Sequence, residues 1–134
     1  MSDKKKSIWE SINYKSTVLG PREGTYRTRV GAGWLVRYKY FGGKWMSANC
    51  IIYFPDRDGA WDIENIKWEL IDDRKGPNEI QSTYRLKVTG GWIVRDDYKT
   101  IQQGVEGKIN HLNLSMTFVP DKEYVWVIEE YGSL

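Results

Sequence analysis

Cysteine and histidine are almost absent from this chain of 134 residues, which contains one of each, Cys50 and His111. A single cysteine cannot form an intramolecular disulfide, and one cysteine with one histidine cannot supply the usual ligands of a zinc site. A nucleophile–histidine pair would have to use these two residues, yet Cys50 lies in an apolar segment, where a free cysteine is usually inert packing. The sequence therefore predicts no metal site, no cofactor and no enzymatic activity.

Long apolar runs and an excess of one charge are also missing. No segment approaches the roughly 20 apolar residues of a membrane-spanning helix. The 20 basic and 18 acidic side chains give a net charge of +2, so no global field draws the chain to nucleic acid or to a membrane. The lysines at 4–6 are followed too soon by Glu10 for a signal peptide. We expect a cytoplasmic protein that binds no membrane and recognises charge only locally.

The chain contains an internal repeat. Residues 26–37 return as 84–95 at an offset of 58, and residues 53–64 return as 118–129 at an offset of 65. A chain of this length fits one domain with a shared core. The predicted organisation of the single domain 1–134 is an N-terminal extension 1–22, a first repeat 23–71, a linker 72–80 and a second repeat 81–134.

Both repeats show strand patterns, and no segment has a helical period. Aromatic and β-branched residues dominate 26–30, 34–40 and 45–54, and glycine turns separate the first two of these segments. Pro55 and Pro120 end the third strand of each repeat, because proline cannot donate to a β-ladder. We therefore expect an all-β domain in which two antiparallel meanders pair about a pseudo-twofold axis into a small barrel or sandwich.

The length of the hairpin turn decides which side chains share a face of the sheet. A three-residue loop at 31–33 places Arg27 opposite Arg37, and the second repeat then places Arg85 opposite Arg95. Two facing cations are unfavourable unless an anion lies between them. One hypothesis is that acids of the same chain pair with these arginines and brace the sheets. The acids that recur in the two repeats are Asp56, Asp58, Glu64, Asp121, Glu123 and Glu129.

An external anion is the other hypothesis, with aromatic side chains beside the arginines. Glycine precedes Trp34 and Trp92, which core packing explains better than a stacking platform, and Trp61 and Trp126 are interpreted in the same way. A cationic and aromatic hairpin end around 38–45 occurs in one repeat only. The candidate ligand-binding residues are Arg27, Arg37, Arg85, Arg95, Tyr38, Tyr40 and Trp45.

The second repeat also resembles a group of small proteins. Residues 90–95 read Gly-Gly-Trp-Ile-Val-Arg, and residues 116–121 read Met-Thr-Phe-Val-Pro-Asp, with Trp126 after them. This pattern is similar to that of small uncharacterised bacterial or phage β proteins with a Gly-Gly-Trp-Leu-Val segment and a Thr-Phe-Val-Pro-Asp segment. The resemblance implies a compact β module of prokaryotic or phage type, and it brings no catalytic residues with it.

Three functions follow from these observations as hypotheses. The first is a non-enzymatic interaction or ligand-binding module that presents a duplicated arginine and aromatic surface to a protein or a small anionic ligand. The second is a single-stranded nucleic-acid-binding protein that uses the same arginines. The third is a carboxylate-dependent hydrolase with Glu64 and Glu129 as acid and base. The sequence leaves the oligomeric state open.

Overall fold

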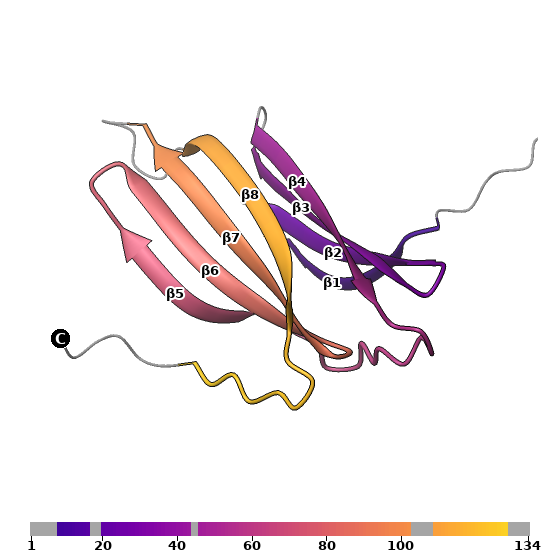
Figure 1. The fold of residues 1–134 in the computed structure, drawn as a ribbon. Helices are drawn as coiled ribbons and strands as arrows, with labels where there is room; N and C mark the ends of the chain where they lie inside the picture. Colours follow the sequence, from indigo (N-terminus) through magenta and orange to yellow (C-terminus); the bar gives the residue numbers. More distant parts are fainter. Residues whose placement is uncertain (1–7, 17–19, 44–45, 103–108, 129–134) are drawn as a thin grey trace, which may run out of the picture.

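Two four-stranded antiparallel sheets make up the protein (Figure 1). The computed structural model describes residues 8–16, 20–43, 46–102 and 109–128. Within these ranges there is no helix, and so none that is long and apolar enough to cross a membrane. The first sheet contains β1 (Glu10–Ser16), β2 (Arg22–Val30), β3 (Gly33–Gly43) and β4 (Met46–Pro55), and the second contains β5 (Glu69–Lys75), β6 (Glu79–Val88), β7 (Gly91–Ile101) and β8 (Ile109–Pro120).

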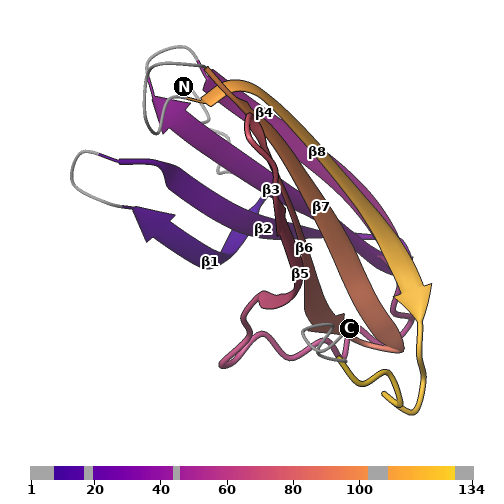
Figure 2. The same cartoon turned by 90° about the vertical axis from the view of Figure 1, so that its left-hand side faces the viewer.

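The sheets pack face to face as an open sandwich. Strands β4 and β8 lie side by side, and both run from top to bottom in Figure 1. Figure 2 shows the two layers from the side. Each sheet is a meander in chain order, so β1 and β5 are edge strands. The predicted all-β pair of meanders is confirmed as a sandwich, while the barrel alternative does not hold because the sheets do not close.

The core lies between the inner faces of the two sheets. Phe54 stacks on Phe118 with ring centroids 5.8 Å apart. A second buried cluster joins Tyr38 and Tyr40 of β3 to Leu112 of β8. Each fully buried side chain of this size contributes about 1.5–3 kcal/mol of transfer free energy. The main cluster combines residues of both halves: Val36, Phe54, Trp61, Leu86, Val88 and Ile93.

The hairpin turn of the first repeat has two residues, and this overturns the predicted register. Val30 pairs with Gly33, which belongs to β3, and Gly31 adopts a positive φ of 50° that closes a tighter turn. Arg27 therefore pairs with Val36, and Arg37 pairs with Tyr26.

The second hairpin has the same register, because Arg85 pairs with Val94 and Arg95 pairs with Tyr84. No two of these four arginines face each other. The prediction of facing arginines is wrong, and the two arginines of each hairpin lie on opposite faces of their sheet.

Each repeat begins earlier than the sequence comparison placed it. Residues 9–13 read Trp-Glu-Ser-Ile-Asn, and residues 68–72 read Trp-Glu-Leu-Ile-Asp. Strands β1 and β5 both shift register at the corresponding point of these segments. Thus β1 lies inside the predicted extension 1–22, and the predicted linker 72–80 contains the end of β5, a turn and the start of β6.

The two halves meet through different faces. Tyr38 lies on the inner face of the first sheet, whereas its counterpart 58 residues later, Asp96, lies on the outer face of the second. Arg95 lies on the inner face of the second sheet, whereas its counterpart Arg37 lies on the outer face of the first. A twofold axis would place equivalent faces of the two sheets against each other. Here unlike faces meet, so the two halves are stacked head to tail and are not related by the predicted pseudo-twofold axis.

Candidate functional site

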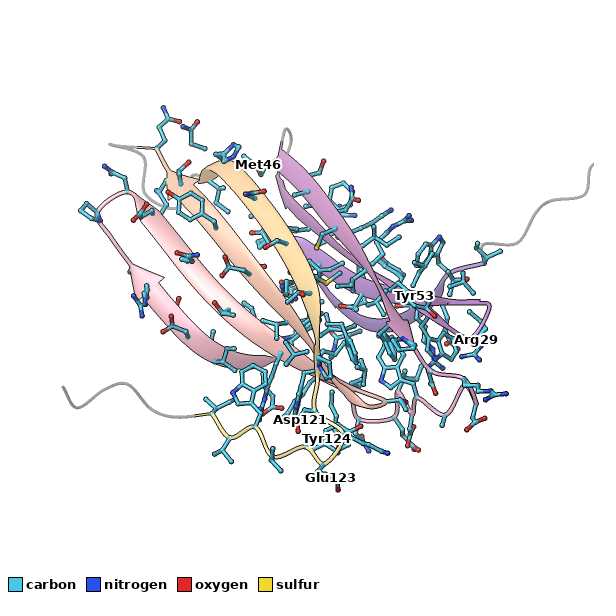
Figure 3. The ribbon with its side chains drawn as sticks, in the orientation of Figure 1. Arg29, Met46, Tyr53, Asp121, Glu123 and Tyr124 are labelled. Carbon is cyan, nitrogen blue, oxygen red and sulfur yellow. The ribbon has the colours of Figure 1, made fainter. Side chains whose placement is uncertain are left out.

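Large apolar side chains are exposed on the outer face of the first sheet. Tyr14 is 54% exposed, Phe41 51%, Ile51 48% and Tyr53 48%. Their register places all four on the same side of β1–β4, opposite the side that carries the core. Four such side chains on one face form a patch of the kind that marks interaction surfaces. Figure 3 shows Tyr53 on the side of β4 away from the second sheet.

Cationic side chains share this face with the apolar ones. Arg22, Arg37 and Lys39 point to the same side, and no carboxylate is among the described side chains that the register places there. Glu23 borders the face at a hollow, but its carboxylate accepts from the hydroxyl of Tyr38 on the inner side. A surface of one sign favours a partner of the opposite sign. We call this surface the basic aromatic face, and its principal residues are Tyr14, Arg22, Tyr26, Arg37, Lys39, Phe41, Ile51 and Tyr53.

Two tyrosine rings lie along the sheet where glycine leaves room for them. A Cβ atom at Gly24 would lie 2.5 Å from the hydroxyl oxygen of Tyr26 and 2.8 Å from its ring. A Cβ atom at Gly33 would lie 2.5 Å from the ring of Tyr53. An aromatic ring that lies over glycine covers backbone that would otherwise be exposed. The rings of Tyr26 and Tyr53 therefore pack against the sheet at Gly24 and Gly33.

Two shallow hollows adjoin each other on the basic aromatic face. One has a volume of about 180 Å³ and the other about 230 Å³, and Tyr26 and Lys39 line both. Arg37 lies in the second hollow with its guanidinium carbon 4.1 Å from the centroid of the Trp9 ring. Its Nε atom is buried without a hydrogen-bond partner among the described residues. The ring therefore positions a cation at the surface.

Two of the predicted ligand-binding arginines serve as structural contacts. Arg27 donates to Glu10 at 2.6 Å and to the backbone oxygen of Trp61 at 2.8 Å. Arg85 is 7% exposed and donates to the backbone oxygen of Trp126 at 2.7 Å. Both guanidinium groups also lie over the tryptophan rings of their own repeat.

Other predicted ligand-binding residues lie between the sheets. Arg95 is 2% exposed, donates to Asp97 at 2.8 Å and lies 3.7 Å from the ring centroid of Tyr38. Burial raises the pKa of Asp97, against the opposing effect of Arg95. Tyr40 is buried, with the amine of Lys99 4.8 Å from its ring centroid.

Trp45, the remaining member of the predicted set, lies outside the described residues. Within the described part of that set, Arg37 alone lies on an outer face of the sandwich that is open to a partner. The surface is therefore not duplicated: the counterpart of Arg37 is the buried Arg95.

The carboxylates of Asp56 and Asp121 accept from indole and backbone N–H groups, and the arginine side chain that contacts Asp56, Arg29, donates to its backbone oxygen at 2.6 Å instead. Asp56 accepts from Trp34 Nε1 and from the backbone N–H of Trp61, both at 2.9 Å. Asp121, labelled in Figure 3, accepts from Trp92 Nε1 and from the backbone N–H of Trp126 at the same distance.

The arginines do have acidic partners within the chain, but from other positions, namely Glu10, Glu69 and Asp97. The hypothesis of internal ion pairs is therefore correct for Arg27, Arg85 and Arg95, but among the described residues their partners are not the recurring acids. These contacts also support the interpretation of the repeated tryptophans as packing.

The residues considered for catalysis lie apart: Cys50 is on the inner face of the first sheet, and His111 is on the outer face of the second. Burial raises the pKa of the Cys50 thiol to about 11, which keeps it protonated. His111 and Glu64 are exposed, and Glu129 lies outside the described residues. A hollow of about 560 Å³ near Glu64 is lined by charged side chains of both signs.

The sequence did not predict the basic aromatic face, because the number of residues in the hairpin turn decides which side chains share this face. Once the turn has two residues, Arg37, Lys39 and Phe41 all point outward, and Ile51 and Tyr53 lie on the same side.

No family model, no curated protein and no solved structure matches this chain.

Proposed function

We propose that this protein is a non-enzymatic, cytoplasmic interaction module that binds an acidic protein segment on the basic aromatic face. One observation carries the proposal: three cations and four half-exposed apolar side chains share a sheet face on which the register places no carboxylate of the described residues. Apolar contact supplies affinity, and the cations select an acidic partner.

An extended acidic segment suits the geometry of this face. Arg37 and Lys39 are alternate residues of β3, so their side chains leave the sheet about 7 Å apart. Alternate side chains of an extended peptide have the same spacing. The rings of Tyr26 and Phe41 flank these cations and offer apolar area to the peptide side chains between the acids.

Nucleic acid is the second candidate because exposed aromatic rings beside cations can stack bases. The tyrosine and phenylalanine rings of the basic aromatic face favour it. Three of the four arginines on which this hypothesis was first based are engaged inside the protein. An acidic protein segment therefore has the stronger support.

The test is the binding of a short fluorescein-labelled peptide of alternating glutamate and valine, followed by fluorescence anisotropy. We expect Arg37→Ala and Lys39→Ala each to weaken binding about tenfold, which corresponds to about 1.4 kcal/mol. Arg57→Ala is the matched control, because Arg57 is exposed on the loop after β4 and its loss should leave binding unchanged.

A matched peptide of alternating lysine and valine should not bind. Equal affinity for both peptides, or no effect of either substitution, would remove the proposal. Tighter binding of a mixed single-stranded oligonucleotide, with a steep dependence on salt, would favour the nucleic-acid candidate instead.

A further inference from the structure

We infer that the partner of the basic aromatic face is a second copy of this chain, which docks through the outer face of its own second sheet. The inference rests on the proposed function, since it names the occupant of the same face. It comes from the head-to-tail stacking of the two halves, which leaves one outer face at each end of the molecule.

Both outer faces have a counterpart inside the sandwich. The basic aromatic face corresponds to the inner face of the second sheet, because Arg37 and Tyr53 correspond to Arg95 and Phe118. The outer face of the second sheet corresponds to the inner face of the first. The two outer faces are thus counterparts of the two faces that already pack together within the chain.

The central contact of the internal interface becomes an ion pair in this arrangement. Inside the chain Tyr38 lies over Arg95 at 3.7 Å. The counterparts are Asp96, on the outer face of the second sheet, and Arg37. When a second copy stacks on the first as the two halves stack within one chain, the carboxylate of its Asp96 lies against the guanidinium of Arg37 of the first copy.

One ring-stacking contact and one cation–π contact have counterparts as well. Inside the chain Phe54 stacks on Phe118, and the amine of Lys99 lies near the ring of Tyr40. The counterparts of the first pair are Val119 and Tyr53, and those of the second are Phe41 and Tyr98. The chemistry that joins the halves is therefore available between copies.

The outer face of the second sheet carries acids that can pair with the cations of the basic aromatic face, and the cation Arg74 on the same outer face is already paired with Asp72 at 3.0 Å. Asp96 is held by hydrogen bonds from Gln81 at 2.9 Å and Thr83 at 2.9 Å, which orient its carboxylate. Glu79 lies on the same face, one alternate residue from Gln81 on β6, and accepts from the hydroxyl of Tyr98 at 2.6 Å. Acids at the end of the face formed by the start of β6 thus meet Arg37 and Lys39.

Such an interface joins different faces, so it does not close on itself after two copies. Head-to-tail contacts that do not close generate open chains of molecules. Wild-type protein should therefore increase in mean mass with concentration, past the mass of a dimer.

The experiment is sedimentation velocity on the full chain over a hundredfold range of concentration at low salt. Arg37→Glu and Asp96→Arg should each abolish association. An equimolar mixture of the two variants should associate again into open chains in which the variants alternate, because each variant carries the faces that complement those of the other. The double variant Arg37→Glu/Asp96→Arg should associate again through the reversed ion pair. Arg57→Glu is the control with no expected effect.

Folding is checked for each variant by circular dichroism, and Asp96→Asn serves as the milder substitution that keeps hydrogen bonding to Gln81 and Thr83. The inference is overturned if the wild-type protein stays monomeric over the whole concentration range, or if it forms a dimer that persists in the Asp96→Arg variant. Peptide binding that still depends on Arg37 would then leave the proposed function standing. Self-association through Asp96 without any binding of the acidic peptide would support the second copy and remove the general acidic segment.

Discussion

At the scale of one residue, Asp56 holds the loop after β4 against β3 of the same repeat. The side chain is 4% exposed and accepts hydrogen bonds from Trp34 Nε1 and the Trp61 backbone. Asp56→Ala leaves both donors buried without an acceptor, at about 1–3 kcal/mol each. We expect urea unfolding to show a loss of about 2–4 kcal/mol. Asp58→Ala, at an exposed position of the same turn, should change stability by less than about 0.5 kcal/mol.

The ionised form of Asp56 gives this contribution a definite pH dependence. Burial alone would raise its pKa, but the hydrogen bonds from Trp34, Trp61 and Thr89 outweigh burial and hold the pKa below the ordinary value. The stabilisation is therefore present above the unfolded pKa of about 3.9 and is lost as pH falls through the lower folded pKa. The stability gap between wild type and Asp56→Asn should narrow below about pH 4; a gap that widens there would contradict this account.

At the scale of the strand and its turn, Gly91 decides how closely β7 approaches β8. A Cβ atom there would collide with the backbone oxygen of Val119 and lie 2.8 Å from the backbone nitrogen of Asp121. Because backbone cannot move aside cheaply, Gly91→Ala should destabilise the protein by about 1–3 kcal/mol.

Gly90 is the matched control for this substitution. It adopts a φ of 80° and has open space around its Cβ position. Asn tolerates that conformation, so Gly90→Asn should cost no more than about 1 kcal/mol. Denaturant unfolding of both variants would decide the matter, and equal losses would show that the turn rather than the contact with β8 is critical.

Turns also explain which parts of the fold the sequence could predict. Strand-forming residues and the repeated Gly-Trp segments were enough to predict two antiparallel meanders. The number of residues in the turn at 31–33 was not readable, because either two or three residues can close a glycine hairpin. That one residue reverses every side chain of the register, which is why Arg37 was grouped with the internal Arg27.

At the scale of the whole molecule, the relation between the sheets lay beyond sequence reasoning for a different reason. Equivalent hairpins carry apolar residues on both sides, as Val36 and Leu35 show, so the repeat does not state which side becomes the core. Packing decides it: Val36 is fully buried, while its counterpart Val94 lies on the outer face of the second sheet. The single exposed copy of the basic aromatic face is a consequence of this choice.

A core shared between unlike faces should make the two sheets unfold together. Leu86 of β6 is fully buried and belongs to the same cluster as Val36 of β3 and Ile93 of β7. Leu86→Ala should cost about 2–5 kcal/mol. Because neither sheet can keep its apolar face in water alone, hydrogen exchange should accelerate by the same factor at the amides of Val36 and Ile93. Leu70→Ala, at a half-exposed position on β5, should leave both amides protected; acceleration confined to the second sheet in Leu86→Ala would show two independent folding units.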